Sequence, residues 1–349
     1  MPSRRRFLRR LLPAATSLVA APTLLLTGCA SWPDAGSAQS RALLAQPPAG
    51  LPRRVRLDAT PFFPQTELQC GPATLATLLN AAGRAVAPAT LSPQLFVPER
   101  GGSLQLEMLA AARRHDAIAT RLPPRLAAAF HELAAGHPVG VMQNLSLAIS
   151  PLWHFAVLIG FDLDRAEVTL RSGTTRELTM DLLTFERTWA RAERWSFVVL
   201  PPEALPDQAE VAAVREGRLG FERVAPIERA VLAWQSAARR WPDDVVLGMG
   251  LGNALVKAGR LAEAAQAFEH TAQASDAAVA WNNLAGVQLQ RRQLPQAREA
   301  ARRAVQRAAL AEPAWLATAQ ATKAEVDAEA DAACATITPI EKSEGTTCQ

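Results

Sequence analysis

Apolar residues recur at helical spacing in the segment that follows a cysteine at position 70. The positions that share one side of this segment are Leu75, Leu78, Leu79 and Ala82. Pro72 suits the first turn of a helix, and Gly83 suits the residue that follows the last turn. The sequence therefore predicts a helix that begins beside Cys70.

Further along the chain, the pattern changes to short apolar runs separated by turn residues. The run from Trp153 to Gly160 predicts a buried strand with an ionisable residue, His154, at its beginning. Other strands are predicted over 138–142, 167–171 and 195–200, and other helices over 103–115, 124–135 and 180–190. Ser103 is expected to cap the first of these helices, with Leu106, Leu109 and Ala110 facing inward. A helix first and then an antiparallel sheet predicts an α+β domain over residues 58–202.

Beyond residue 202 the composition shifts to alanine, arginine and glutamine, and a period of 33 to 34 residues appears. Five positions, Leu251, Gly252, Leu261, Ala264 and Phe268, recur 33 residues later as Leu284, Ala285, Leu294, Ala297 and Ala301. This spacing resembles tetratricopeptide repeats, with two nearly complete units at 243–275 and 276–308. We expect an all-α repeat domain over 203–335 with a groove for a peptide or protein segment, and core positions for Trp234, Trp281 and Trp315. A plain bundle of helical hairpins is the alternative.

The N-terminal segment is typical of an export signal. Residues 3–9 (Ser-Arg-Arg-Arg-Phe-Leu-Arg) resemble a twin-arginine motif, and an apolar run follows. Residues 26–29 (Leu-Thr-Gly-Cys) resemble a bacterial lipobox, which implies cleavage after residue 28 and lipidation of Cys29. With alanine at position 30, the lipoprotein sorting rule implies the periplasmic face of the outer membrane. An uncleaved membrane anchor is the alternative, although Pro13 and Pro22 interrupt the run. Residues 29–57 are predicted to form a flexible tether.

The charge balance argues against a nucleic-acid partner. The formal net charge is +4, but five arginines lie in the N-terminal segment, and their removal lowers it to −1. The predicted folded body therefore lacks the basic excess expected of a nucleic-acid-binding protein.

Cys70 and His154 are the residues with the clearest chemical potential. A helix N-terminus favours an anionic sulfur, as a thiol nucleophile requires. A cysteine at a helix tip and a histidine at a strand end form the pairing used in thiol acyl transfer. The histidine, cysteine and carboxylate spacings do not resemble a metal site, and we expect no cofactor.

Three stretches together resemble the bacteriocin-processing (double-glycine leader) cysteine peptidases, which are papain-like: residues 65–80, residues 154–160, and a tail with Phe185, Trp189 and 195–201. The resemblance implies that Cys70 is the nucleophile and that His154 is the general base and acid. It also implies that Gln65 helps to bind the oxyanion. Ser172 occupies the position where the family has an aspartate that orients the imidazole. Asp162 and Asp164 are charged substitutes, but they lie in a turn.

Each of these residues also has a structural interpretation. Cys70 is consistent with a small core residue, and His154 with a cap on a core edge. Gln65 is consistent with a side chain that bonds loop backbone, and Ser172 with a turn residue. The other histidines, which are expected to be structural, are His115, His131, His137 and His270.

Two cysteines lie near the C-terminus. Residues 336–349 are polar and are expected to form a loose tail. In an exported protein, Cys334 and Cys348 are a candidate disulfide, which would leave Cys70 as a free thiol.

The sequence supports three hypotheses. The first is an exported, lipid-anchored cysteine peptidase whose repeat domain recruits a peptide or protein substrate or an envelope partner. The second is a catalytically weak scaffold that retains the peptidase fold for binding, which the missing charge at Ser172 favours. The third is amide or transpeptidase chemistry on peptidoglycan at the same site.

Overall fold

The computed structural model describes residues 35–65, 69–97 and 102–335. The predicted export signal, Cys29, Cys348 and the C-terminal tail lie outside these ranges. Within them, no helix combines the length and the apolar character needed to span a bilayer.

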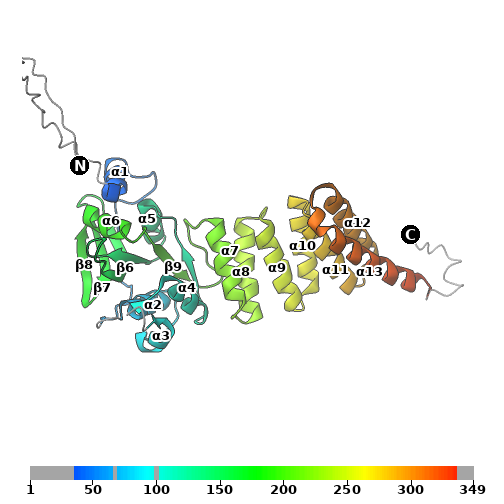
Figure 1. Cartoon of the computed structure of the whole chain (residues 1–349), viewed down its shortest axis with the longest axis horizontal. Helices are drawn as coiled ribbons and strands as arrows, with labels where there is room; N and C mark the ends of the chain where they lie inside the picture. Colours follow the sequence, from blue (N-terminus) through cyan, green and yellow to red (C-terminus); the bar gives the residue numbers. More distant parts are fainter. Residues whose placement is uncertain (1–34, 66–68, 98–101, 336–349) are drawn as a thin grey trace, which may run out of the picture. The chain divides into compact units, whose positions relative to one another are not determined.

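A seven-stranded sheet forms the centre of the first domain (Figure 1). Its strands are β1 (Arg54–Arg56), β4 (Ile118–Arg121), β5 (Val139–Asn144), β6 (Trp153–Asp162), β7 (Glu167–Ser172), β8 (Thr175–Asp181) and β9 (Ser196–Leu200). The order is β4-β9-β5-β6-β7-β8, and β1 also pairs with β6. Each of these pairs is antiparallel, as the sequence predicts. A separate short hairpin joins β2 (Phe96–Val97) to β3 (Gly102–Ser103).

Helices cover both faces of this sheet (Figure 1). On one face lie α2 (Cys70–Ala81), α3 (Pro88–Leu95) and α4 (Gln105–Arg113). On the other lie α1 (Ala38–Ala45), α5 (Leu126–Ala134) and α6 (Leu182–Ala190). The alternation along β6 explains the two cores, because Phe155 and Val157 pack with the α2 side whereas Ala156 and Leu158 pack with the α5 and α6 side.

The prediction of a flexible tether over 29–57 is wrong for its second half. Helix α1 and strand β1 both lie in this stretch. The Glu186 carboxylate accepts hydrogen bonds from the backbone N–H groups of Gln39 and Ser40, and Leu43 is buried in the core. These long-range contacts order a segment whose own composition favours a loop.

Local boundaries differ from the prediction in two further places. The helix predicted from Ser103 begins at Gln105, because Ser103 is paired in the β2–β3 hairpin. Leu106 is 73% exposed, and Met108 instead faces the core. Strands β4 and β8 are not predicted, because β4 has only four residues and β8 is mostly polar and exposed.

Helical hairpins make up the rest of the described chain. The helices are α7 (Val211–Glu222), α8 (Ile227–Arg240), α9 (Val245–Lys257), α10 (Leu261–Ser275), α11 (Ala278–Gln290), α12 (Leu294–Ala311) and α13 (Leu316–Ala335). Pairs α9–α10 and α11–α12 coincide with the two predicted units. Trp234 and Trp281 are buried, and Trp315 is half-buried against the same core. Small residues allow these helices to approach closely: a Cβ atom at Gly252 would lie 2.3 Å from the Phe268 ring.

This close approach predicts the outcome of two glycine substitutions. Gly252→Ala should lower the free energy of unfolding by about 1–3 kcal/mol, because the added methyl group overpacks the Phe268 contact. Gly286 is the matched control, since a Cβ there would meet nothing within 4 Å. Gly286→Ala should be stabilising by about 0.5–1 kcal/mol through helix propensity alone. Urea unfolding followed by circular dichroism measures both, and equal effects would contradict the packing described.

Candidate active site

Cys70 is the first residue of α2, and its side chain is half-buried. The next nine residues, 71–79, are all buried. The body of the helix is therefore inaccessible to solvent, whereas Cys70 at its N-terminus is partly accessible. Cys70 is a free thiol. The first amide groups of a helix lack intrahelical acceptors, so the sulfur lies where N–H groups are available to an anion.

Gly71 follows the cysteine because the hairpin that carries Ser103 packs directly against it. A Cβ atom at Gly71 would lie 2.3 Å from Ser103 Oγ and 2.5 Å from Ser103 Cβ. A larger residue would push the helix tip away from this hairpin. Glycine at position 71 therefore fixes where Cys70 lies relative to Ser103.

His154 is the second residue of β6 and pairs with Gln143 of β5. Its Nε2 atom lies 2.8 Å from Ser172 Oγ, at the end of β7. Burial lowers the pKa of the His154 imidazole from 6.5, because desolvation penalises the charged ring. The neutral ring is therefore the favoured form near pH 7.

The contact with Ser172 leaves His154 able to act as a base through its other ring nitrogen. When Ser172 Oγ accepts the Nε2 proton, the lone pair of the neutral ring is on Nδ1. No hydrogen bond of Nδ1 occurs within the described ranges. Ser172 therefore contacts the imidazole through a neutral hydroxyl, without the negative charge of an aspartate.

Gln65 lies next to this pair. Its backbone N–H donates to the carbonyl of Gly173, the residue after Ser172, at 3.0 Å. Its side-chain Oε1 is buried and has no hydrogen-bond partner in the described part of the chain. This unpaired atom is an acceptor, whereas an oxyanion needs the side-chain Nε2–H donor, so the orphaned oxygen does not itself support the oxyanion role.

Arg171 secures the segment that leads to Gln65. The guanidinium is 2% exposed and donates to the backbone carbonyls of Thr60, Asp58 and Arg176. Burial lowers its pKa. Because Arg171 precedes Ser172 in β7, the same strand holds both the orienting hydroxyl and the approach to the glutamine loop.

Two neighbouring residues at the end of β7 thus link the predicted site residues: Ser172 contacts the His154 ring, and Gly173 accepts from the Gln65 backbone N–H. Cys70 enters from α2, which packs against β6 through the core shared with Phe155. Between described residues, no hydrogen bond joins the Cys70 sulfur to the imidazole. The charged substitutes do not reach the ring: Asp162 is at the opposite end of β6 and pairs with Arg54, and Asp164 pairs with Arg53.

The remaining predicted site residues have separate positions. Cys334 is in the last helix, α13, and is disulfide-bonded. Cys29 and Cys348 lie outside the described residues, so the Cys334–Cys348 pairing and the lipidation of Cys29 stay predictions. Over the described ranges, no group of three His, Cys, Asp or Glu side chains is arranged to hold a metal ion.

From the sequence, Ser103 is assigned only to a helix cap, and Arg171 is not singled out. Ser103 Oγ is buried beside Gly71 without a hydrogen-bond partner in the described chain. A glycine directly after Cys70 is consistent with a residue packed closely against the helix N-terminus, but the sequence does not identify that residue as Ser103. An arginine inside an otherwise apolar strand was the available signal for Arg171, because burial of a guanidinium demands acceptors.

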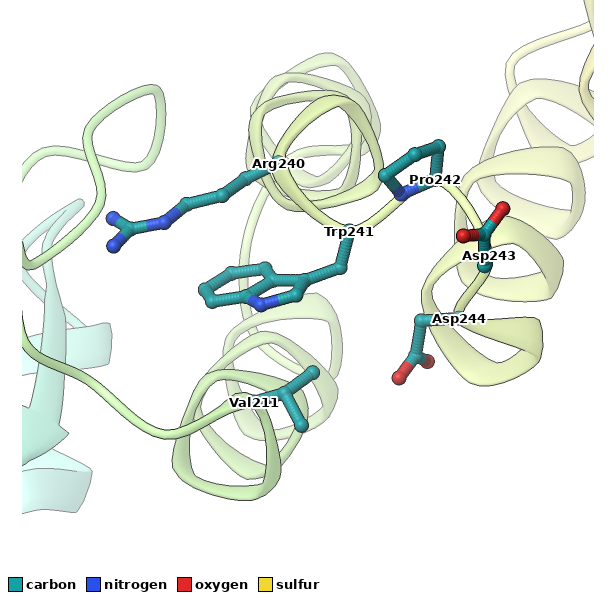
Figure 2. A pocket seen from close by; sticks show the side chains of 6 residues that line it. All are labelled: Val211, Arg240, Trp241, Pro242, Asp243 and Asp244. Atoms are coloured by element: carbon teal, nitrogen blue, oxygen red, sulfur yellow. The ribbon is translucent and has the colours of Figure 1, made fainter.

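A cavity of about 410 Å³ lies in the helical domain, away from these residues. Figure 2 shows the six residues that line it: Val211, Arg240, Trp241, Pro242, Asp243 and Asp244. The Arg240 guanidinium carbon lies 4.9 Å from the centre of the Trp241 ring. Arg240 also donates to the carbonyls of Pro206 and Asp207, and Asp244 caps α9. These partners give the polar side chains structural roles.

No protein-family model matches the chain, and no curated protein matches it. Distant likenesses are found among solved structures. One, described as a C39-like peptidase from Bacillus anthracis, is 18% identical over 41% of this chain and 96% of its own, with a TM-score of 0.36. A double glycine motif protease from an AMS/PCAT transporter, in complex with the leader peptide, is 22% identical over 40% and 91%, with a TM-score of 0.31. The MamA RS-1 ArsTM double mutant is 16% identical over 35% and 78%, with a TM-score of 0.26. At these TM-scores the likenesses carry no argument about activity.

The Ser172 contact predicts how a charge at this position acts on the imidazole. In the wild type, the His154 ring should titrate below pH 6.5, because burial lowers its pKa. Ser172→Asp should raise that pKa, since a carboxylate near Nε2 favours the protonated ring. Titration of the ring signals by NMR measures both values. Ser172→Asn is the uncharged control of similar size, and equal titration of the Asp and Asn variants would contradict the contact.

Proposed function

We propose that the chain is an exported, lipid-anchored cysteine peptidase that cleaves peptide bonds by a Cys–His mechanism. The observation that carries the proposal is the hydrogen-bonded line from Gln65 through Gly173 and Ser172 to His154. In the proposal, Gln65 supplies the oxyanion donor, Ser172 the orienting group and His154 the base, and the packing of α2 against β6 supports the approach of Cys70. The free thiol of Cys70 is the nucleophile that such a group of residues requires.

The reaction uses the neutral imidazole as a general base. Nδ1 of His154 takes the thiol proton as the Cys70 sulfur attacks the carbonyl carbon of the substrate. The resulting oxyanion is stabilised by the Gln65 side-chain amide and the Cys70 backbone N–H. The imidazolium then gives its proton to the leaving amine, and a thioester with Cys70 remains. His154 next takes a proton from water, whose oxygen attacks the thioester, and the carboxylate product and the thiol are released.

Ser172 is expected to lower the rate of this reaction relative to a site with an aspartate at the same position. A hydroxyl orients the imidazole but adds no negative charge to stabilise the imidazolium, and burial already lowers the pKa of His154. This observation favours the second candidate function, a catalytically weak scaffold that retains the site for binding. Amide or transpeptidase chemistry remains a further use of the same groups, with an amine in place of water.

The helical hairpins from α9 to α13 supply the proposed recruitment domain. Their 33-residue recurrence and close packing at small residues support tetratricopeptide-type repeats. In the proposal, this domain holds a peptide or protein substrate or an envelope partner. Lipid attachment at Cys29 keeps both domains at the periplasmic face of the outer membrane.

Alkylation of Cys70 distinguishes the enzyme from the scaffold. Reaction with iodoacetamide at pH 7 should slow at least about tenfold in His154→Ala, because the imidazole no longer accepts the thiol proton. Hydrolysis of a quenched-fluorescent peptide library should fall by about 10²–10⁴. Labelling is read by mass at the Cys70 peptide.

His115→Ala is the matched control, because this histidine follows α4 and bonds Gln94 rather than the site. It should leave both rates unchanged. A Cys70 that reacts no faster than a model thiol, and equally in wild type and His154→Ala, would establish the scaffold instead.

A further inference from the structure

The loop that precedes His154 exposes an unusual number of large apolar side chains. The segment here called the apolar loop consists of the loop 145–152 and Trp153, the first residue of β6. It reads Leu-Ser-Leu-Ala-Ile-Ser-Pro-Leu-Trp and contains no charge. Within it, Leu147 is 65% exposed, Ile149 91%, Leu152 59% and Trp153 49%. Contiguous exposed apolar surface of this kind marks an interaction site.

The apolar loop is held in place by its own hydrogen bonds. Asn144 Oδ1 accepts from the backbone N–H groups of Ser146 and Leu152, both at 3.0 Å. Leu145 N–H donates to the Leu152 carbonyl at 2.9 Å. Asn144 itself is buried. The loop therefore presents its apolar side chains from a fixed base, and their exposure does not come from fraying.

Arg191, the residue that follows α6, contacts this base. The Arg191 guanidinium donates to the Asn144 carbonyl at 3.2 and 3.1 Å, and both Arg191 and Arg187, one helical turn earlier, are exposed. An apolar tip beside cationic side chains matches a bilayer with anionic headgroups. Trp153 is of the type that collects at membrane interfaces.

The start of the described chain is attached to the same helix. Ser40 Oγ donates to the carbonyl of Leu182, at the beginning of α6, and the Glu186 side chain accepts from the Ser40 N–H. Residues 35–40 are helical, so the chain that can extend runs from Cys29 to Ala35, which is six residue steps or about 20 Å. Helix α6 has nine residues, which corresponds to about 14 Å. A lipid on Cys29 therefore has enough chain to reach a surface that the apolar loop touches.

We propose that the apolar loop inserts into the surface of an anionic lipid bilayer and places the His154 end of the sheet against the membrane. The shape of the loop favours lipid over a peptide, because Ile149 at 91% exposure protrudes from the surface, whereas peptide side chains bind in concave pockets. The inference goes beyond the proposed peptidase and does not depend on its activity. It implies that any substrate is met at the membrane surface.

Quenching of tryptophan emission tests the insertion. The full chain is bound to vesicles of phosphatidylethanolamine and phosphatidylglycerol whose acyl chains carry bromine, which quenches nearby indoles. The reference carries Trp32→Phe, because Trp32 lies three residues from Cys29. We expect quenching of this reference, loss of most of it in Trp153→Phe, and no change in Trp315→Phe, the matched control from the helical domain.

A second pair of variants tests the contribution of the tip. Ile149→Ser in the same background should weaken insertion about tenfold, because serine gains much less free energy than isoleucine on leaving water. The weaker insertion is read as a lower vesicle-bound fraction or lower quenching. Leu310→Ser, at an exposed leucine of α12, should have no effect. Quenching that is equal with and without Trp153 would overturn the proposal. So would an Ile149→Ser variant that keeps full quenching but raises the KM for peptides in the absence of vesicles, which would assign the loop to substrate.

Discussion

The enclosure of α2 is the constraint on which the rest of the first domain depends. Nine consecutive residues of this helix are buried, between the sheet on one side and α3, α4 and the β2–β3 hairpin on the others. A helix packed in this way cannot rotate or slide without opening a core. The position of its first residue, Cys70, is therefore fixed relative to the sheet. The close packing of Ser103 against Gly71 fixes its position relative to the β2–β3 hairpin.

The imidazole is positioned by different forces from those that position the thiol. His154 is fixed by strand pairing with Gln143 and by the hydrogen bond to Ser172. Burial lowers the pKa of the ring, and no charged side chain of the described residues bonds it, so the neutral form is favoured. A site of this kind is suited to proton transfer during attack and less suited to a standing thiolate–imidazolium pair. The serine at position 172 thus separates two properties that an aspartate would supply together, orientation and charge.

Much of the first domain could be predicted from sequence because its periodicities are strong. The apolar spacing after Cys70 and the run at 153–160 gave α2 and β6, and turn residues separated the antiparallel strands. Order in residues 38–56 could not be predicted, because α1 depends on Glu186, almost 150 positions away in the chain, and β1 depends on pairing with β6. The grouping of Gln65 with Ser172 was likewise available only from a resemblance, since a backbone hydrogen bond to Gly173 creates it. Arg171 and Ser103 act through long-range contacts that leave no periodic signal.

The central claim is that the sulfur of Cys70 and the imidazole of His154 act in one site. The most direct measurement is reaction of the folded chain with a short bifunctional alkylating agent such as 1,3-dibromoacetone, followed by peptide mass analysis. The account predicts a single bridge that joins the peptide containing Cys70 to the peptide containing His154, formed by the native protein and not by the unfolded chain. Alkylated Cys70 without that bridge, or bridged to a different residue, would contradict it.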